Sequence, residues 1–173
     1  AYGIPPGNPF IGATNFNNIA VDSNTVLTEL YATGLRNPWR ISFDTVTSNL
    51  WCGNVGGRAY EGLFIISNKQ NCSWAFYEQN HNGPKIGSAP PGFTYTRAVW
   101  EYGHGSGAFQ GNSLTGGRVY RGATVPSLQG FYVCADYVSG NVWALWLTNG
   151  VVTISNRITG MTGIVAFGAD PSN

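Results

Sequence analysis

The sequence predicts an all-β fold, and three observations support this prediction. Short apolar and aromatic runs of strand length recur along the 173 residues, and no helical periodicity extends over roughly 11 residues or more. Glycine and proline, with 24 and 9 residues, combine with Asn, Asp and Ser to separate these runs. Aromatic residues make up 14% of the chain and charged residues only 10%. Long surface helices rich in Lys, Glu and Ala are therefore not expected.

The expected strands are rich in β-branched or aromatic residues and are bounded by turn-forming residues. They cover residues 28–32, 40–43, 50–52, 63–66, 73–77, 98–102, 118–120, 131–135, 142–147 and 151–154. Residues 80–96 are rich in Gly, Pro and Asn and interrupt this rhythm. We expect this segment to be a long loop.

A faint internal repeat indicates how the strands are grouped. Residues 50–55 and 132–137 share one pattern: two apolar residues, Cys, a small residue, Asn or Asp, and an apolar residue. One more strand follows each copy, which is typical of successive blades of a β-propeller.

The repeat predicts the boundaries of the blades. We expect residues 28–68 to form one blade and residues 72–148 another, with the excursion at 80–96. Residues 1–27 would end a preceding blade, and residues 149–173 would start the next. About two and a half blades cannot close a ring, so we expect the chain to be a fragment of a longer polypeptide.

Composition excludes several classes of function. A formal net charge of +1 gives no electrostatic basis for binding nucleic acid or an anionic membrane surface. No apolar run approaches the ~20 residues that a transmembrane helix needs. The two histidines, His81 and His104, lack the spacing of zinc ligands relative to the cysteines.

The sequence offers candidates for two kinds of covalent modification, disulfide formation and N-glycosylation. Cys52, Cys72 and Cys134 are disulfide candidates, and their odd number allows at most one internal bridge. The alternative is that all three are small buried apolar residues. Asn71, followed by Cys72 and Ser73, forms a weak N-glycosylation sequon that matters only in a secreted protein.

Five segments in order resemble the glucose/sorbosone dehydrogenase family, which consists of six-bladed β-propellers. The family is related to soluble sugar dehydrogenases that use pyrroloquinoline quinone (PQQ), and hedgehog-interacting-protein-like proteins belong to the same superfamily. The segments are Gly-Leu-Arg-Asn-Pro at 34–38, Gly-Asn-Val-Gly-Gly at 53–57, Asn-Cys-Ser-Trp at 71–74, Ser-Leu-Thr-Gly-Gly-Arg-Val-Tyr-Arg-Gly at 113–122, and residues 128–143. The resemblance implies that the chain is part of a six-bladed β-propeller.

The resemblance also implies a cofactor site. Arg36 and Asn37 match residues that face the quinone or the substrate in the PQQ enzymes. Gly56 and Gly57 match the loop that holds calcium there. The alternative is that Arg36 and Asn37 only stabilise their turn, through hydrogen bonds to backbone carbonyls. No catalytic residue is expected within this chain, because the family's catalytic histidine belongs to an earlier blade.

The chain departs from the active enzymes at several of these positions. Arg40 follows Pro38 and Trp39 where the enzymes carry Gln after Pro. The calcium loop lacks the usual Asp and Gln, and Gly62 stands where a second Glu is usual. The late-blade turn that supplies cations in the enzymes carries Ser139 and Asn141 here.

Two further residue types leave alternatives open. His104 lies in a glycine-rich loop, where it either contacts a sugar or is simply solvated. The six tryptophans either offer sugar-stacking platforms or pack between blades.

From these features we expect an extracellular or secreted propeller module, catalytically degenerate, that serves binding or assembly within a larger protein. Its partners would be the remaining blades of the same polypeptide, and neighbouring subunits or glycans. The alternatives are a PQQ- and calcium-dependent aldose dehydrogenase and a carbohydrate-binding module.

Overall fold

The structure is a computed structural model, and it describes residues 2–170. The chain forms two units, a smaller one from residues 2–35 and 66–97 and a larger one from residues 36–65 and 98–170. Strands dominate both, and the helical elements among the described residues are two short 3-10 turns, η1 (Ile86–Ser88) and η2 (Pro126–Leu128). No described helix has the length and apolar character needed to cross a membrane. The prediction of an almost entirely β fold is confirmed.

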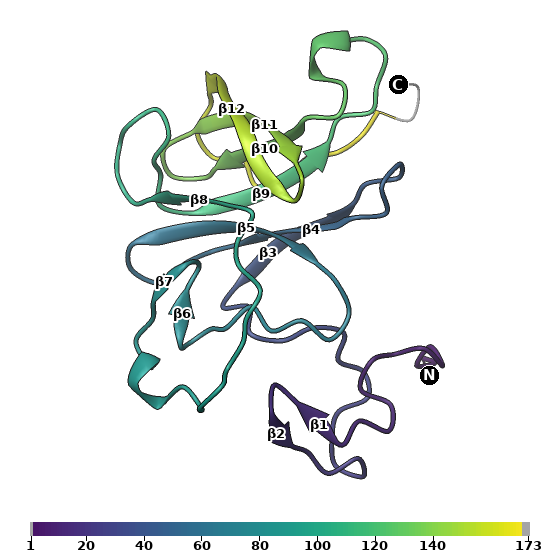
Figure 1. Cartoon of the computed structure of the whole chain (residues 1–173). Coiled ribbons are helices and arrows are strands. Elements are labelled where there is room, and N and C mark those ends of the chain that lie inside the picture. Colours follow the sequence, from purple (N-terminus) through teal and green to yellow (C-terminus); the bar gives the residue numbers. More distant parts are fainter. Residues whose placement is uncertain (1, 171–173) are drawn as a thin grey trace. The chain divides into compact units, whose positions relative to one another are not determined.

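The larger unit is built from two four-stranded sheets (Figure 1). The first has the order β3-β4-β5-β8. The second has the order β12-β11-β10-β9, in which β10, β11 and β12 each pair antiparallel with the strand before them in the chain. The strands of the first sheet are β3 (Pro38–Phe43), β4 (Leu50–Asn54), β5 (Tyr60–Ile66) and β8 (Trp100–Gly103). Those of the second are β9 (Leu114–Val119), β10 (Tyr132–Asp136), β11 (Asn141–Thr148) and β12 (Val151–Gly160).

The smaller unit consists mainly of loops with two short hairpins. One hairpin pairs β1 (Asn15–Phe16) with β2 (Ile19–Ala20), and the other pairs β6 (Tyr77–Glu78) with β7 (His81–Asn82). Side-chain amides take the place of longer sheet ladders, and Asn17 joins residues far apart in the sequence by binding the backbone of Thr94.

The core of the larger unit lies between its two sheets. Strand alternation places one face of each sheet in this core. Trp51 of β4 stacks on Tyr132 of β10 with ring centroids 4.4 Å apart. The first sheet also contributes Leu63 and Tyr102, and the second Leu114, Cys134, Trp143 and Leu145.

Glycines allow the two sheets to approach closely at β4 and β9. A Cβ atom on Gly53 would lie 2.6 Å from the Cα of Gly116, and Gly116 itself has a φ of +82°. Only glycine combines this conformation with such close backbone contact at low cost. The sheets therefore pack backbone against backbone at this point, next to the ends of β3 and β4.

The observed strands match most of the expected ones, with two exceptions. Residues 28–32 form no strand, and residues 73–77 form a turn that ends in β6. In the first segment a turn closes from Leu30 to Leu27, and in the second the N–H groups of Phe76 and Tyr77 both bind the carbonyl of Ser73. These local hydrogen bonds take the place of a ladder, which apolar composition alone does not predict.

The strands are also grouped differently from the expected blades. β8 pairs with β5 and completes the first sheet, and β12 is the fourth strand of the second sheet. The sheets therefore span 38–103 and 114–160, and the loop at 80–96 lies within the first of them. The sequence pattern locates strands but carries no signal for a pairing across so long a connection.

Candidate functional site

Four of the five segments that resemble the family meet at one cavity of the larger unit, which we call the site cavity. It has a volume of about 360 Å³. It lies where β3 and β9 begin and where β4 and β10 end. Its lining consists of Asn37, Trp39, Val55, Ser113, Thr115, Tyr137 and Val165. The geometry thus brings together Asn37 and the loop after β4, both of which the sequence singled out.

Arg36 does not line this cavity but binds the loop that follows β4. Its Nη1 donates to the carbonyl oxygen of Gly56 at 2.6 Å and to that of Val55 at 3.4 Å. The buried side chain of Asn54 accepts hydrogen bonds from the N–H groups of Arg36 and Asn37, both at 3.0 Å, through Oδ1. This arrangement corresponds to the turn-stabilising alternative for Arg36.

Glu61 connects the same loop to the second sheet. Its carboxylate is completely buried. Oε2 accepts from the N–H groups of Gly56 (3.2 Å) and Leu114 (2.9 Å), while Oε1 lies 2.9 Å from Nε2 of His104. Burial raises the pKa of Glu61, and the hydrogen bonds from Leu114, His104 and Gly56 act against that rise. His104 is therefore held by a buried carboxylate instead of being a freely solvated loop residue.

Asp136, at the end of β10, is a second completely buried carboxylate beside the site cavity. Oδ2 accepts from the hydroxyl of Tyr102 at 2.7 Å and from the N–H groups of Asn112 and Ser113 at 2.7 and 2.6 Å. Oδ1 accepts from two more N–H groups in the turn after β10. Burial and the neighbouring Asp136 carboxylate raise the pKa of Tyr102 far above its ordinary value.

The sequence patterns assigned neither Asp136 nor Glu61 a role at the site. The structure shows both as anchors of the loops that line the site cavity. Several of their interaction partners lie 23 to 53 residues away in the sequence, so spacing gives no signal for them. A carboxylate at the edge of an otherwise apolar strand is the one local hint.

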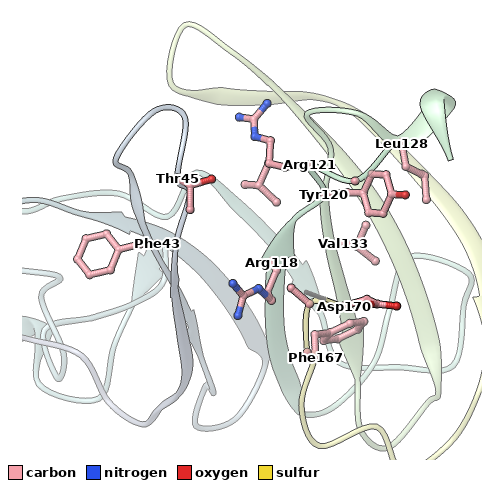
Figure 2. A pocket seen from close by; sticks show the side chains of 13 residues that line it. Phe43, Thr45, Arg118, Tyr120, Arg121, Leu128, Val133, Phe167 and Asp170 are labelled. Carbon is pink, nitrogen blue, oxygen red and sulfur yellow. The ribbon is translucent and has the colours of Figure 1, made fainter. Parts of the chain in front are cut away.

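A second cavity of about 400 Å³ lies at the opposite ends of the same strands. Figure 2 shows Phe43 at the end of β3, Arg118 and Val133 from β9 and β10, and Phe167 of the C-terminal segment around it. Arg121 lies beside it and binds the buried carboxylate of Asp44 with two hydrogen bonds, of 2.8 and 2.6 Å.

The Asp44–Arg121 pair predicts acid sensitivity of the fold. The hydrogen bonds from Arg121 hold the pKa of Asp44 well below its usual range. A carboxyl with a lowered pKa in the folded state stabilises it fully above the unfolded value of about 3.9, and this contribution is lost progressively as the pH falls from that value through the lowered folded-state pKa. Asp44→Asn should therefore destabilise the protein more at pH 6 than at pH 2.5. Urea unfolding at the two pH values measures this, and an equal loss at both would contradict it.

The remaining candidates line neither of these two cavities. Cys52, Cys72 and Cys134 are buried, and among residues 2–170 they form no disulfide; burial raises the pKa of Cys52 to about 12. In the smaller unit, Oδ1 of Asn71 accepts the N–H of Ser73 at 2.8 Å, and Ser73 is fully buried. The folded sequon thus presents no exposed hydroxyl.

Comparison with known proteins identifies the family. The family model described as Glucose / Sorbosone dehydrogenase matches residues 3–165. The chain belongs to the glucose/sorbosone dehydrogenase family. The HIPL1 protein of Arabidopsis thaliana is 36% identical over 178 residues, an alignment that covers 96% of this chain but 23% of HIPL1. The chain thus spans about a quarter of the length of this curated relative.

Solved structures of glucose and sugar dehydrogenases share the fold. The apo form of the soluble aldose sugar dehydrogenase from Escherichia coli aligns with a TM-score of 0.67 and 19% identity, covering 90% of this chain and 41% of that one. The PQQ-bound aldose sugar dehydrogenase from Streptomyces coelicolor aligns with a TM-score of 0.58 and 16% identity, covering 91% and 36%. The two four-stranded sheets are therefore blades of a β-propeller, as the internal repeat predicted.

The calcium loop of this family member does not fit a calcium ion. Ca²⁺ takes about 6–8 oxygen ligands, among them carboxylates. Here the carbonyl of Gly56 faces the guanidinium of Arg36, and Oδ1 of Asn54 already accepts two N–H groups. Within residues 2–170 no group of three or more His, Cys, Asp and Glu residues is placed to hold a metal ion.

The part of the site-cavity lining that this chain supplies offers no cationic donors, which the carboxylates and quinone carbonyls of PQQ call for. Among the described residues that line the cavity, none is Lys or Arg. Arg40 lies next to the lining residue Trp39, but its Nε donates to the carbonyl of Val165 at 3.0 Å. The residues present offer hydroxyls, an amide and aromatic rings instead.

Proposed function

We propose that the chain is part of an extracellular, catalytically degenerate propeller module that serves binding or assembly within a larger protein. The hydrogen bond from Arg36 to the carbonyl of Gly56 carries this proposal. The guanidinium of Arg36 binds the carbonyl oxygen of Gly56, which a calcium ion would need as a ligand. A cationic side chain of the protein therefore takes the place of the metal cation of the family's site. The low share of charged residues, 10%, suits a surface that is covered by neighbours or glycans.

The partners that we propose are the remaining blades of the same polypeptide, and neighbouring subunits or glycans. Alternate residues of the edge strand β3 support this proposal. Trp39, Ile41 and Phe43 are 50%, 63% and 64% exposed. Exposed apolar residues in such a row mark surfaces that another protein element covers.

A carbohydrate in the site cavity is the second candidate function. Trp39 and Tyr137 are 50% and 49% exposed at this cavity. Their rings can lie against the apolar face of a sugar, while Asn37, Ser113 and Thr115 can hydrogen-bond to its hydroxyls. This candidate needs neither PQQ nor calcium.

Arg36→Met tests the degenerate site in the full polypeptide. Because Arg36 supports a loop and not a cofactor, we expect no dye reduction with aldoses, PQQ and Ca²⁺ in the wild type or the variant. Loss of the bond to Gly56 should lower the free energy of unfolding by about 1 kcal/mol. Steady-state dye reduction and urea unfolding are the measurements.

The matched control is Arg118→Met, because Arg118 is exposed and lies at the opposite ends of the strands. We expect its stability to match the wild type. Aldose turnover that requires PQQ and is lost in Arg36→Met but kept in Arg118→Met would overturn the proposal in favour of a working dehydrogenase. A glycan array on the same proteins tests the second candidate.

A further inference from the structure

The smaller unit contains a groove that the family resemblance did not indicate. It has a volume of about 380 Å³ and is lined by residues 15–17, 69–71 and 94–96. We call it the amide groove, because four of its lining side chains are Asn or Gln. Its size falls in the range of roughly 300–1,000 Å³ that is typical of small-molecule sites.

One wall of the amide groove is fixed by the pairing of Asn17 with Thr94. Nδ2 of Asn17 donates to the carbonyl of Thr94 at 2.8 Å, and Oδ1 accepts the N–H of Thr94 at 2.9 Å. Next to this pair, the ring of Tyr95 stacks on Tyr77 with centroids 4.1 Å apart. The Asn17 contacts hold the 94–96 segment against the first hairpin, and the Tyr95–Tyr77 stack holds it against the hairpin of β6 and β7.

The backbone of residues 69–71 fixes the opposite wall. The N–H of Lys69 donates to Tyr31 at 2.8 Å, and the carbonyl of Gln70 accepts the N–H of Thr33 at 2.9 Å. The carbonyl of Asn71 accepts the N–H of Thr96 at 2.8 Å and joins the two walls. The groove is thus largely preformed, which lowers the entropic cost of binding.

Several donors in the amide groove have no acceptor among the residues that the structure describes. Among residues 2–170 the structure shows no hydrogen bond or ion pair for the exposed ammonium of Lys69 or for the side-chain amide of Asn15. Gln70 uses Oε1 to accept the N–H of Ser67 at 2.7 Å, so its NH₂ group keeps its donors. Lys69 is also alone among the described lining residues in carrying a charge at neutral pH.

We propose that the amide groove binds an acidic carbohydrate, a sugar ring that carries a carboxylate or a sulfate group. Lys69 binds the anionic group through a charge-assisted hydrogen bond. The amides of Asn15 and Gln70 and the hydroxyl of Thr96 bind ring hydroxyls, because each of these groups matches a sugar's mixture of donors and acceptors. Phe16 provides an apolar ring beside them. The site lies wholly within the smaller unit and is independent of the proposed function of the site cavity.

Calorimetric titration of the full chain tests this proposal, with trigalacturonate, its methyl ester and a sulfated galactan oligosaccharide as probes. The methyl ester should bind about tenfold more weakly than the acid, since it keeps the hydroxyls but loses the charge. Lys69→Met should weaken binding of the acid about tenfold and leave the ester unchanged. A preference between the two anionic probes distinguishes a carboxylate ligand from a sulfate ligand.

The chain offers a matched control, because Lys85 is its other lysine and lies exposed outside the groove. Lys85→Met should bind every probe like the wild type. Asn15→Asp adds a negative charge to the groove and should weaken binding of the acid but not binding of the ester. Both variants replace exposed side chains, and their thermal unfolding should match the wild type.

Three outcomes would overturn the proposal. In the first, Lys69→Met and Lys85→Met weaken binding of the acid equally. In the second, the wild type binds the acid and its methyl ester with equal affinity. In the third, the wild type binds no probe at millimolar concentration. None of them depends on dye reduction or on Arg36, so a working dehydrogenase in the site cavity would leave this proposal standing.

Discussion

Asp136→Ala is expected to lower the free energy of unfolding by about 3–5 kcal/mol. The carboxylate is completely buried and accepts five hydrogen bonds, from the Tyr102 hydroxyl and from four backbone N–H groups. Alanine leaves the buried Tyr102 hydroxyl and four partly buried N–H groups without this acceptor, and an unsatisfied buried donor costs more than a hydrogen bond contributes. Urea unfolding followed by tryptophan fluorescence measures the loss.

Two further variants sharpen this prediction. Asp136→Asn keeps Oδ1 as an acceptor but turns a donor towards the Oδ2 partners, so we expect an intermediate loss of about 2–3 kcal/mol. Asp22→Ala is the control, because Asp22 is exposed and binds only its own turn. A loss below about 1 kcal/mol in Asp136→Ala would contradict the role of this carboxylate as an anchor.

Gly117→Ala is expected to destabilise the protein by about 3 kcal/mol or more. A Cβ on Gly117 would lie 1.7 Å from the carbonyl oxygen of Val133 and 2.7 Å from its carbon. Both are backbone atoms of β10, so no side-chain rotation relieves the clash, and β9 and β10 must move apart. Gly168→Ala is the control, since a Cβ there meets nothing within 4 Å. A thermal unfolding midpoint of Gly117→Ala equal to that of the control would show that the sheet adapts without cost.

The sequence predicted the fold because local patterns determine where strands lie. Eight of the ten expected runs lie within or overlap strands of the two four-stranded sheets, since alternating apolar residues between turns are a local signal. The pairing of β8 with β5 was not predicted, because the connection between them holds the whole loop at 80–96. The place of Asn37 beside the cavity followed from the family resemblance, as did that of the loop after β4.

Sequence patterns did not predict the contacts between the side chains of the site. Glu61 and His104 are 43 residues apart, and Tyr102 and Asp136 are 34 apart. Whether Arg36 faces a cofactor or a backbone carbonyl depends on a side-chain torsion that no spacing encodes. The amide groove was not anticipated either, because Asn15, Gln70 and Thr96 each look like ordinary loop residues.

The buried carboxylates of Asp136 and Glu61 accept hydrogen bonds from the N–H groups of two consecutive residues. Ser113 donates to Asp136, which belongs to the second sheet, and Leu114 donates to Glu61, which belongs to the first. If one blade opened alone, a buried carboxylate would lose hydrogen-bond donors that the other blade supplies. Native-state hydrogen exchange should therefore show these blades as one foldon, in which slow amides of β5 and β10 share a single opening free energy.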